Sequence, residues 1–460
     1  MAKTNPPTTP QTTPQSTPQS TTQALTLQMT PLKAALCDAP GLKLDVLLRV
    51  QALGEAPTQR TPLSIALVID RSGSMAHGKL QAAKDCARDL VKRLHPQDEV
   101  SLVVYDDKVQ VAMPLTLVEQ ARISLQAVLA CIDSGGSTDL HGGWLAGAQQ
   151  LAPRTGQGRM CRVILLSDGQ ANHGITDEDE ISQQVRLLAN SGVTTTTVGI
   201  GSGFNESLMT AMAVAGQGNA HYGDRAEDLA EPFDAELGLL AHLAWRDVKV
   251  QIGSATSRWE LLNDYALIGN GQWSLPSIPA NAEAWACFSV RMSSALSAQS
   301  RSRQGKALHV TVTARDAQGE EQRFTASLEA LPVVDAATWA QTPADELVAR
   351  RLVELQSANL QRSIRQAVQR RDWREAEMLL RQVKALASEH PWIQGTVEQL
   401  EELLSRRDHE RMEKELAYAS FSMSRRVAEV DEMASFSAAE ESAKPAYLRR
   451  KSRQGRGSGA

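Results

Sequence analysis

The stretch from Leu67 to Met75 reads LVIDRSGSM and joins an apolar strand to a polar turn. The apolar run LSIALVI ends at Asp70, and Ser72 and Ser74 follow at alternate positions on either side of Gly73. A run of Val, Ile and Leu without strict alternation predicts a strand that is buried on both faces, as in parallel sheets. Because α/β sheets bind ligands at the carboxyl ends of their strands, the polar turn indicates a binding site.

Strands and helices alternate over residues 61–243, around that stretch. The helical segments, such as HGKLQAAKDCARDLVKRL, carry apolar residues on one face. Thr176 with Asp179 resembles a capping box at the start of another helix. The alternation predicts a mostly parallel, doubly wound, Rossmann-like α/β sheet, with VQVAMPL as an antiparallel edge strand. The expected strands are LSIALVI, EVSLVVY, VQVAMPL, CRVILLS, VTTTTVGI and AHYGD.

The remaining regions differ in composition. Residues 1–23 are rich in Thr, Pro and Gln, and residues 435–460 form a basic tail; we expect both to be disordered. Residues 244–333 contain strand runs separated by turns, which indicates an antiparallel β-sandwich domain. Residues 24–60 are too short for a core of their own, so we expect their strands to join that sandwich, with the α/β domain inserted between them. In residues 338–434, apolar stripes at helical spacing predict a helical region that begins with a hairpin similar to a tetratricopeptide unit.

Bulk composition narrows the class of protein. The chain has 460 residues and a net charge of -5, which gives no reason to expect a nucleic-acid partner. No run is long and apolar enough to cross a bilayer, and the first residues lack the hydrophobic centre of a secretory signal. Five cysteines without a CxxC pair fit reduced, buried thiols, so we expect a cytoplasmic protein. A secreted adhesin is the alternative if export uses a route without a signal peptide.

Three separate turns carry matching oxygen chemistry. The first holds Asp70, Ser72 and Ser74; the second, SGGSTDLHGG, holds Thr138; the third, SDGQAN, holds Asp168. Hydroxyl and carboxylate oxygens without His or Cys suit Mg²⁺, with Mn²⁺ or Ca²⁺ as alternatives, rather than zinc. Two carboxylates would about neutralise a divalent ion, which would still need waters or an outside carboxylate to complete its coordination. The composition therefore suits capture of an Asp or Glu on a partner.

The motifs DRSGSM, STDL and SDG, in this order, resemble the metal-ion-dependent adhesion site of von Willebrand factor A (VWA) domains, over about Pro62 to Leu243. The whole arrangement is similar to bacterial proteins related to calcium-activated chloride channel regulators and inter-alpha-trypsin-inhibitor heavy chains. The resemblance implies a metal site in which the three hydroxyls are ligands and the two aspartates act directly or through water. The ligand set is Asp70, Ser72, Ser74, Thr138 and Asp168. Ser137 is the alternative to Thr138, and we expect the neighbouring His141 at the surface or rim rather than as a ligand.

Three functions follow from this site. The first is a non-enzymatic module whose bound Mg²⁺ coordinates an exposed Asp or Glu of a protein partner. The second, implied by the resemblance, is a regulatory subunit of an AAA+ ATPase or of a kinase or phosphatase assembly. The third is a metal-assisted hydrolase, which we rank last because the sequence places no His or Glu base near the motifs and contains no P-loop, nucleophile elbow or HExxH.

Overall fold

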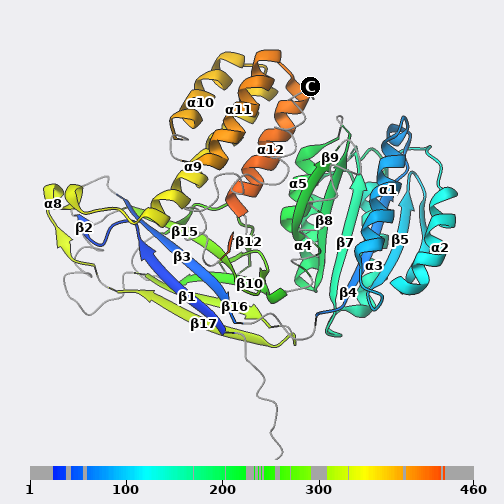
Figure 1. Cartoon of the computed structure of the whole chain (residues 1–460), viewed down its shortest axis with the longest axis horizontal. Coiled ribbons are helices and arrows are strands. Elements are labelled where there is room, and N and C mark those ends of the chain that lie inside the picture. The colour runs from blue at the N-terminus through cyan, green and yellow to red at the C-terminus, as the bar shows by residue number, and fades with distance from the viewer. Residues whose placement is uncertain are drawn as a thin grey trace, which may run out of the picture.

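The computed structural model forms three parts in mutual contact: an α/β sheet, a β-sandwich and a helical region (Figure 1). It describes residues 24–37, 43–54, 60–168, 170–201, 204–223, 233, 237, 240, 243–253, 259–269, 271–291, 308–316, 318–329, 331–386, 390–425 and 428–429. The two tails that the sequence predicts to be disordered, residues 1–23 and 435–460, lie outside these ranges. None of the helices within them is both long and apolar enough to cross a membrane.

The α/β part is a six-stranded sheet with the order β6-β5-β4-β7-β8-β9. Neighbouring strands pair in parallel, except that β6 is an antiparallel edge strand beside β5. This confirms the predicted fold class, because the apolar runs form central strands that are buried along their full length. The strands are β4 (Leu63–Asp70), β5 (Glu99–Tyr105), β6 (Val109–Leu117), β7 (Met160–Ser167), β8 (Val193–Ile200) and β9 (Gln217–Gly223).

Helices cover both faces of this sheet. The apolar faces of α1 (Lys79–Arg93) and α2 (Val118–Ala130) pack on one side, and those of α3 (Leu140–Leu151), α4 (Glu178–Asn190) and α5 (Glu206–Ala215) pack on the other. Helix α3 lies very close to the strands, since a Cβ on Gly147 would come within 2.4 Å of Val68. The expected capping box of α4 is wrong by one residue: Asp177 caps the helix by accepting from the backbone N–H of Glu180 at 2.8 Å.

The sandwich contains two antiparallel sheets around a shared apolar core. One has the order β1-β3-β15-β11 with β19 beside β15, and the other β12-β13-β10-β16-β17 with β14 beside β10. Because β3 pairs with β15 over nine positions, strands before and after the α/β domain share one sheet. The bounds are β1 (Ala24–Pro31), β3 (Lys43–Leu53), β10 (Leu243–Gly253), β11 (Glu260–Leu261), β12 (Leu267–Ile268), β13 (Gln272–Ser274), β14 (Ile278–Pro279), β15 (Ala282–Arg291), β16 (Leu308–Arg315), β17 (Glu321–Leu328) and β19 (Ala428–Glu429), with a separate parallel pair, β2 (Leu36–Cys37) and β18 (Val333–Val334).

The helical region contacts both other parts. Helix α12 packs back on α9, and α9 covers the outer face of the sandwich around Trp285. A buried ion pair fixes that contact, with Arg351 Nη2 at 3.3 Å from Glu283 Oε1. Tyr418 of α12 packs its ring on those of Phe204 and Tyr222 in the α/β domain. The helices are α8 (Ala336–Gln341), α9 (Glu346–Gln369), α10 (Trp373–Leu386), α11 (Pro391–Arg406) and α12 (His409–Arg425).

All five cysteines lie within the described residues, and none of them is in a disulfide. Four are buried, as expected for small apolar side chains, but Cys131 is exposed at the end of α2. The interpretation of every cysteine as a buried thiol is therefore wrong at this one position.

Candidate metal centre

The residues predicted as metal ligands all lie at a strand end or on turns at the carboxyl edge of the α/β sheet. Asp70 is the last residue of β4, and Asp168 comes directly after β7. These two strands are parallel neighbours, and the two carboxylates are close enough for the charge of Asp168 to raise the pKa of Asp70. Ser72 and Ser74 belong to the turn η1 (Gly73–Met75) and its cap, and Thr138 lies just before α3.

Asp70 is fully buried and accepts hydrogen bonds on both carboxylate oxygens. The backbone N–H of Ser72 donates to Oδ1 at 2.8 Å, and the hydroxyl of Ser167 donates to Oδ2 at 2.6 Å. Burial raises the pKa of Asp70, and the neighbouring Asp168 raises it further, while the hydrogen bonds from Ser167 and Ser72 lower it in part. The net effect is a raised pKa, because burial destabilises the charged form of this carboxylate more than the hydrogen bonds stabilise it.

The first and second turns are tied together through their backbones. The N–H of Gly73 donates to the carbonyl of Gly136 at 3.1 Å, and the N–H of Gly135 donates to the carbonyl of Arg71 at 2.8 Å. Gly136 has φ +76, and a Cβ there would lie 2.3 Å from Asp107, so glycine is required. The hydroxyls of Ser72 and Ser74 are 3.1 Å apart in the turn fixed by these bonds.

Thr138 joins the second turn to the third. Its N–H donates to Asn172 Oδ1 at 2.7 Å, and its carbonyl accepts from the backbone N–H groups of Asn172 and His173, each at 3.1 Å. The Thr138 side chain is buried, whereas Ser137 is exposed. Of the two candidate hydroxyls on this turn, that of Thr138 is therefore the one enclosed between the loops.

Asp168 has the least satisfied carboxylate of this group. The side chain is buried, and Oδ1 has no hydrogen-bond partner among the residues that the structure describes. The ammonium of Lys79 lies 3.3 Å from Oδ2. A buried charged oxygen without a donor is costly, and a cation is the partner that removes the cost. The donor set at this edge, with hydroxyl and carboxylate oxygens, suits a hard divalent ion.

Three residues that shape the site were not predicted from the sequence: Lys79, Ser167 and Asn172. Ser167 and Asn172 lie within the stretch SDGQAN, but their roles, like that of Lys79, depend on contacts that only the fold creates. His141 was placed wrongly, since it is buried and its Nε2 lies 2.8 Å from Gln184 Oε1. No group of three or more His, Cys, Asp or Glu side chains in the described ranges is arranged to hold a metal ion, and the candidate site combines only two carboxylates with hydroxyl groups.

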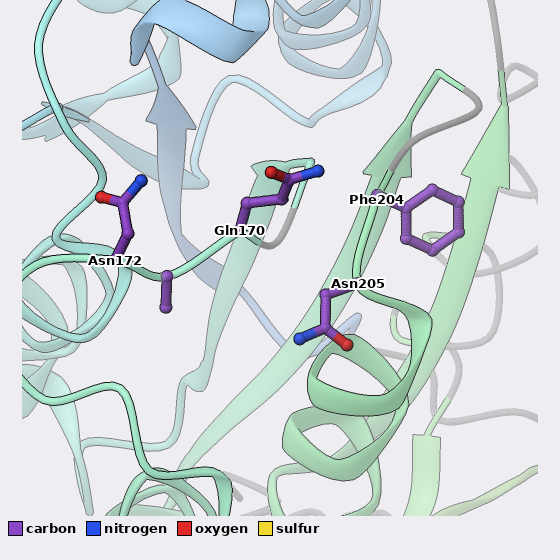
Figure 2. A pocket seen from close by; sticks show the side chains of 5 residues that line it. Gln170, Asn172, Phe204 and Asn205 are labelled. Atoms are coloured by element: carbon purple, nitrogen blue, oxygen red, sulfur yellow. The ribbon is translucent and has the colours of Figure 1, made fainter.

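An open cavity of about 400 Å³ lies beside Asp168. It lies between the segment after β7 and the start of α5, and Figure 2 shows its side chains on these two segments. Asn205 caps α5, because its Oδ1 accepts from the backbone N–H of Leu208. The backbone N–H of Asn205 donates to the carbonyl of Asp168 at 2.9 Å. The amide nitrogen of Asn205 then faces the cavity as a donor (Figure 2). The lining residues are Gln170, Ala171, Asn172, Phe204 and Asn205.

Comparison with known proteins identifies the class of domain. Residues 64–235 match the von Willebrand factor type A domain, and this chain therefore contains a VWA domain, as the motifs indicated. The chain is 30% identical over 213 residues to the uncharacterized protein YfbK of Escherichia coli. The aligned region covers 46% of this chain and 36% of that protein. It is 27% identical over 206 residues to inter-alpha-trypsin inhibitor heavy chain H1 of Sus scrofa. Here the aligned region covers 43% of this chain and 23% of that protein. The chain thus spans less than half the length of these curated relatives.

Solved structures extend the likeness beyond the VWA domain. A von Willebrand factor type A protein from Catenulispora acidiphila aligns over 87% of this chain and 98% of its own, with a TM-score of 0.65 and 16% identity. The ArnB paralog VWA2 from Sulfolobus acidocaldarius aligns over the same shares, with a TM-score of 0.59 and 16% identity. At these identities the likeness concerns the fold alone. It covers more of the chain than the VWA domain does.

Proposed function

We propose that this protein is a metal-dependent interaction module. A divalent ion, Mg²⁺ in the first instance, binds at the carboxyl edge of the VWA sheet. Its ligands are Asp70, Ser72, Ser74, Thr138 and Asp168, directly or through water. The ion then coordinates an acidic side chain of a protein partner. VWA domains commonly mediate protein–protein interactions, which is consistent with this assignment.

The observation that carries the proposal is that Oδ1 of the buried Asp168 has no hydrogen-bond partner among the described residues. Buried carboxylates in folded proteins are normally paired or hydrogen-bonded, because an unpaired one destabilises the fold. Asp168 Oδ1 has no such partner among the described residues, although it lies at an edge where three turns are fixed to one another by hydrogen bonds. A cation at this point supplies the missing partner.

The balance of charge favours an acidic ligand. Hydroxyl ligands are neutral, so Asp70 and Asp168 supply the negative charge and leave the ion electrophilic. Mg²⁺ requires octahedral coordination, and the positions not filled by the protein are open to water or to an incoming carboxylate. The cavity beside Asp168 gives the rest of the ligand a place to lie, and the amide of Asn205 offers a donor for a main-chain carbonyl.

Binding, rather than catalysis, is also the better match to the side chains around the turns. A metal-assisted hydrolase needs a base within hydrogen-bond reach of the bound water. The imidazole Nε2 of His141 is engaged with Gln184 Oε1 at 2.8 Å. We therefore propose a non-enzymatic role, in line with a domain class associated with interaction.

Titration calorimetry with Mn²⁺ and Mg²⁺ on the full chain tests the metal site. We expect saturable uptake of one ion by the wild type and none by Asp168→Ala. The matched control is Asp179→Ala, which removes an exposed carboxylate of α4 in the same domain and is expected to bind the ion normally. No uptake by the wild type, or equal uptake by Asp168→Ala, overturns the assignment.

A peptide-display selection tests the ligand class. With Mg²⁺ present, we expect enrichment of peptides that share an Asp or Glu, and loss of that enrichment in EDTA or with Ser72→Ala. Circular dichroism of Ser72→Ala serves as the folding control. Enrichment of peptides without an acidic residue, or enrichment that persists in EDTA, contradicts the proposed recognition.

A further inference from the structure

Lys79 places a positive charge at the proposed metal site. It is the first residue of α1, and its Nζ lies 3.3 Å from Oδ2 of Asp168, the carboxylate whose other oxygen is bare. The Asp168 side chain is fully buried and that of Lys79 is 26% exposed, so this pair is screened less than an ordinary surface ion pair.

Packing holds the Lys79 side chain in this position. A Cβ on Gly201 would lie 2.9 Å from Cε and 3.3 Å from both Cδ and Cγ of Lys79, so the stem runs directly over the backbone at the end of β8. Gly201 has φ +78 and lacks a side chain, which leaves the space that the lysine stem fills. The ammonium is therefore directed at Asp168 by contacts along its length.

The position of Lys79 in its helix is unfavourable for helix stability. The N-terminal end of a helix carries partial positive charge, so acidic residues are stabilising in the first turn and a lysine is not. The first turn of α1 contains no acidic residue to offset it. The lysine thus occupies a place where helix stability alone would select against it, which points to a role in the site that it faces.

We propose that Lys79 is a resident cation that tunes the metal site toward acidic ligands, an inference that rests on the proposed function. Asp70 and Asp168 together neutralise a divalent ion, and Lys79 leaves the loaded site with one positive charge in excess. The ammonium therefore weakens the binding of the ion alone, because it repels the ion and competes for Asp168. The same excess charge strengthens the binding of a carboxylate once the ion is present.

This assignment differs measurably from a purely structural one. If Lys79 merely fixes the orientation of Asp168, its loss disorders a ligand and weakens metal binding. If it acts as a competing cation, its neutralisation tightens metal binding. The two roles predict opposite directions for the same measurement, and a carboxylate that binds only through the loaded site provides a second, independent readout.

The experiment measures Mn²⁺ affinity by electron paramagnetic resonance in the wild type, Lys79→Met, Lys79→Gln and Lys79→Arg. We expect the two neutral variants to bind Mn²⁺ about three- to tenfold more tightly, and Lys79→Arg to resemble the wild type. Lys92→Met is the matched control: it removes a lysine from the far end of α1, where Nζ pairs with Asp89 at 3.0 Å, and should leave Mn²⁺ affinity unchanged. Lys79→Gln keeps a polar donor in place if the Met variant folds poorly.

A second arm uses acetate as a carboxylate probe. We expect added acetate to raise the apparent Mn²⁺ affinity of the wild type more than that of Lys79→Met or Lys79→Gln. Unchanged or weaker Mn²⁺ binding by both neutral variants overturns the role of Lys79 while leaving the metal site intact. A wild type that takes up no Mn²⁺ overturns the proposed metal site itself, and the role of Lys79 with it.

Discussion

The two edges of the VWA sheet both gather buried carboxylates, but they treat them in opposite ways. At the amino edge, Asp98 accepts four hydrogen bonds: two from Arg60 at 2.6 and 2.8 Å, and one each from the backbone N–H groups of Leu63 and His95 at 2.8 Å. Every oxygen of this aspartate has two donors. Its charge is fully compensated from within the chain.

Glu99 at the same edge is compensated in the same way. Arg154 donates to both of its carboxylate oxygens at 2.8 to 3.1 Å, Ser64 donates its hydroxyl at 2.9 Å, and Arg159 lies 3.3 Å away. At the carboxyl edge, by contrast, no arginine pairs with Asp70 or Asp168 among the contacts of the described residues, and one oxygen of Asp168 is bare. The residue types are the same, so the supply of donors is what distinguishes a structural carboxylate from one that is open to a cation.

The largest expected effect is on metal binding at the carboxyl edge. Asp168→Asn keeps the shape of the side chain but removes a charged ligand, so we expect Mn²⁺ affinity to fall by about a hundredfold or more, roughly 3 kcal/mol. In EDTA, the free energy of unfolding should change by less than about 1 kcal/mol, because loss of the pair with Lys79 is offset by removal of a buried charge whose Oδ1 has no hydrogen-bond donor. Calorimetric titration and urea unfolding measure the two quantities. A large loss of stability without loss of affinity would erase the contrast between the edges.

The corresponding substitution at the amino edge should lower stability and leave metal affinity unchanged. Asp98→Asn leaves Arg60 without its partner and removes half of the acceptor capacity, so we expect the free energy of unfolding to fall by about 2 to 4 kcal/mol. Mn²⁺ affinity of the folded protein should not change. Urea unfolding with and without Mn²⁺ separates the effects, and Arg60→Met should reproduce most of the loss. Weakened Mn²⁺ binding in Asp98→Asn would show that the two edges are coupled.

The fold was predictable because its signals are local and repeated. The buried strands read as unbroken apolar runs, and the strand ends at Asp70 and Ser167 coincide with the motifs. The sequence predicts Thr176 as the cap of α4 instead of Asp177, because both residues have side-chain oxygens that can accept from a helix N–H, and only the backbone geometry decides between them. Such a displacement by one residue does not change which face of the helix packs inward.

The candidate site was predictable as a set of oxygens and not as an electrostatic arrangement. Spacing within DRSGSM points to Asp70 and its serines, but nothing in the sequence indicates that Lys79 reaches Asp168 from the next helix. The same holds for Asn172, which bonds to the backbone of Thr138 across 34 positions of sequence. Contacts of this kind depend on how strand ends are brought together, so motif spacing cannot contain them.

A smaller effect is expected from loosening the carboxyl edge without removing a ligand. Asn172→Ala deletes the acceptor for the Thr138 N–H at 2.7 Å, which frees the second turn from the third. Outer groups that orient ligands typically alter metal affinity by about tenfold, so we expect Mn²⁺ binding to weaken by roughly that factor. The free energy of unfolding should fall by no more than about 1 kcal/mol, because Asn172 is exposed.

The control for Asn172→Ala is Gln157→Ala. This substitution deletes a side-chain hydrogen bond to the Pro153 carbonyl near the amino edge, at 2.8 Å. Mn²⁺ affinity should be normal in that variant. Equal weakening in both variants would mean that Mn²⁺ affinity reports general loosening of the domain and not the order of the three turns.

The smallest expected effect is on the pH dependence of stability, to which the carboxylates of the two edges contribute with opposite sign. Although burial acts to raise the pKa of Glu99, the hydrogen bonds from Arg154 and Ser64 and the charges of the arginines lower it below its ordinary value of 4.5. The folded state therefore favours the charged glutamate, so this contribution to stability is present above about pH 4.5 and is lost as the pH falls through the lowered pKa. Asp70 has the opposite shift, and its burial penalty is relieved as the pH falls through its raised pKa toward 3.8.

Urea unfolding from pH 3 to 6 in EDTA, over the range in which carboxylates titrate, measures both contributions. Glu99→Gln should lose less stability on acidification than the wild type, because the variant has no charged form to lose. Asp70→Asn should lose more, since it no longer gains from protonation of a buried carboxylate, and at neutral pH it should be at least as stable as the wild type. If both variants changed the pH dependence in the same direction, the carboxylates of the two edges would share one electrostatic environment, and the donor count would no longer account for their different roles.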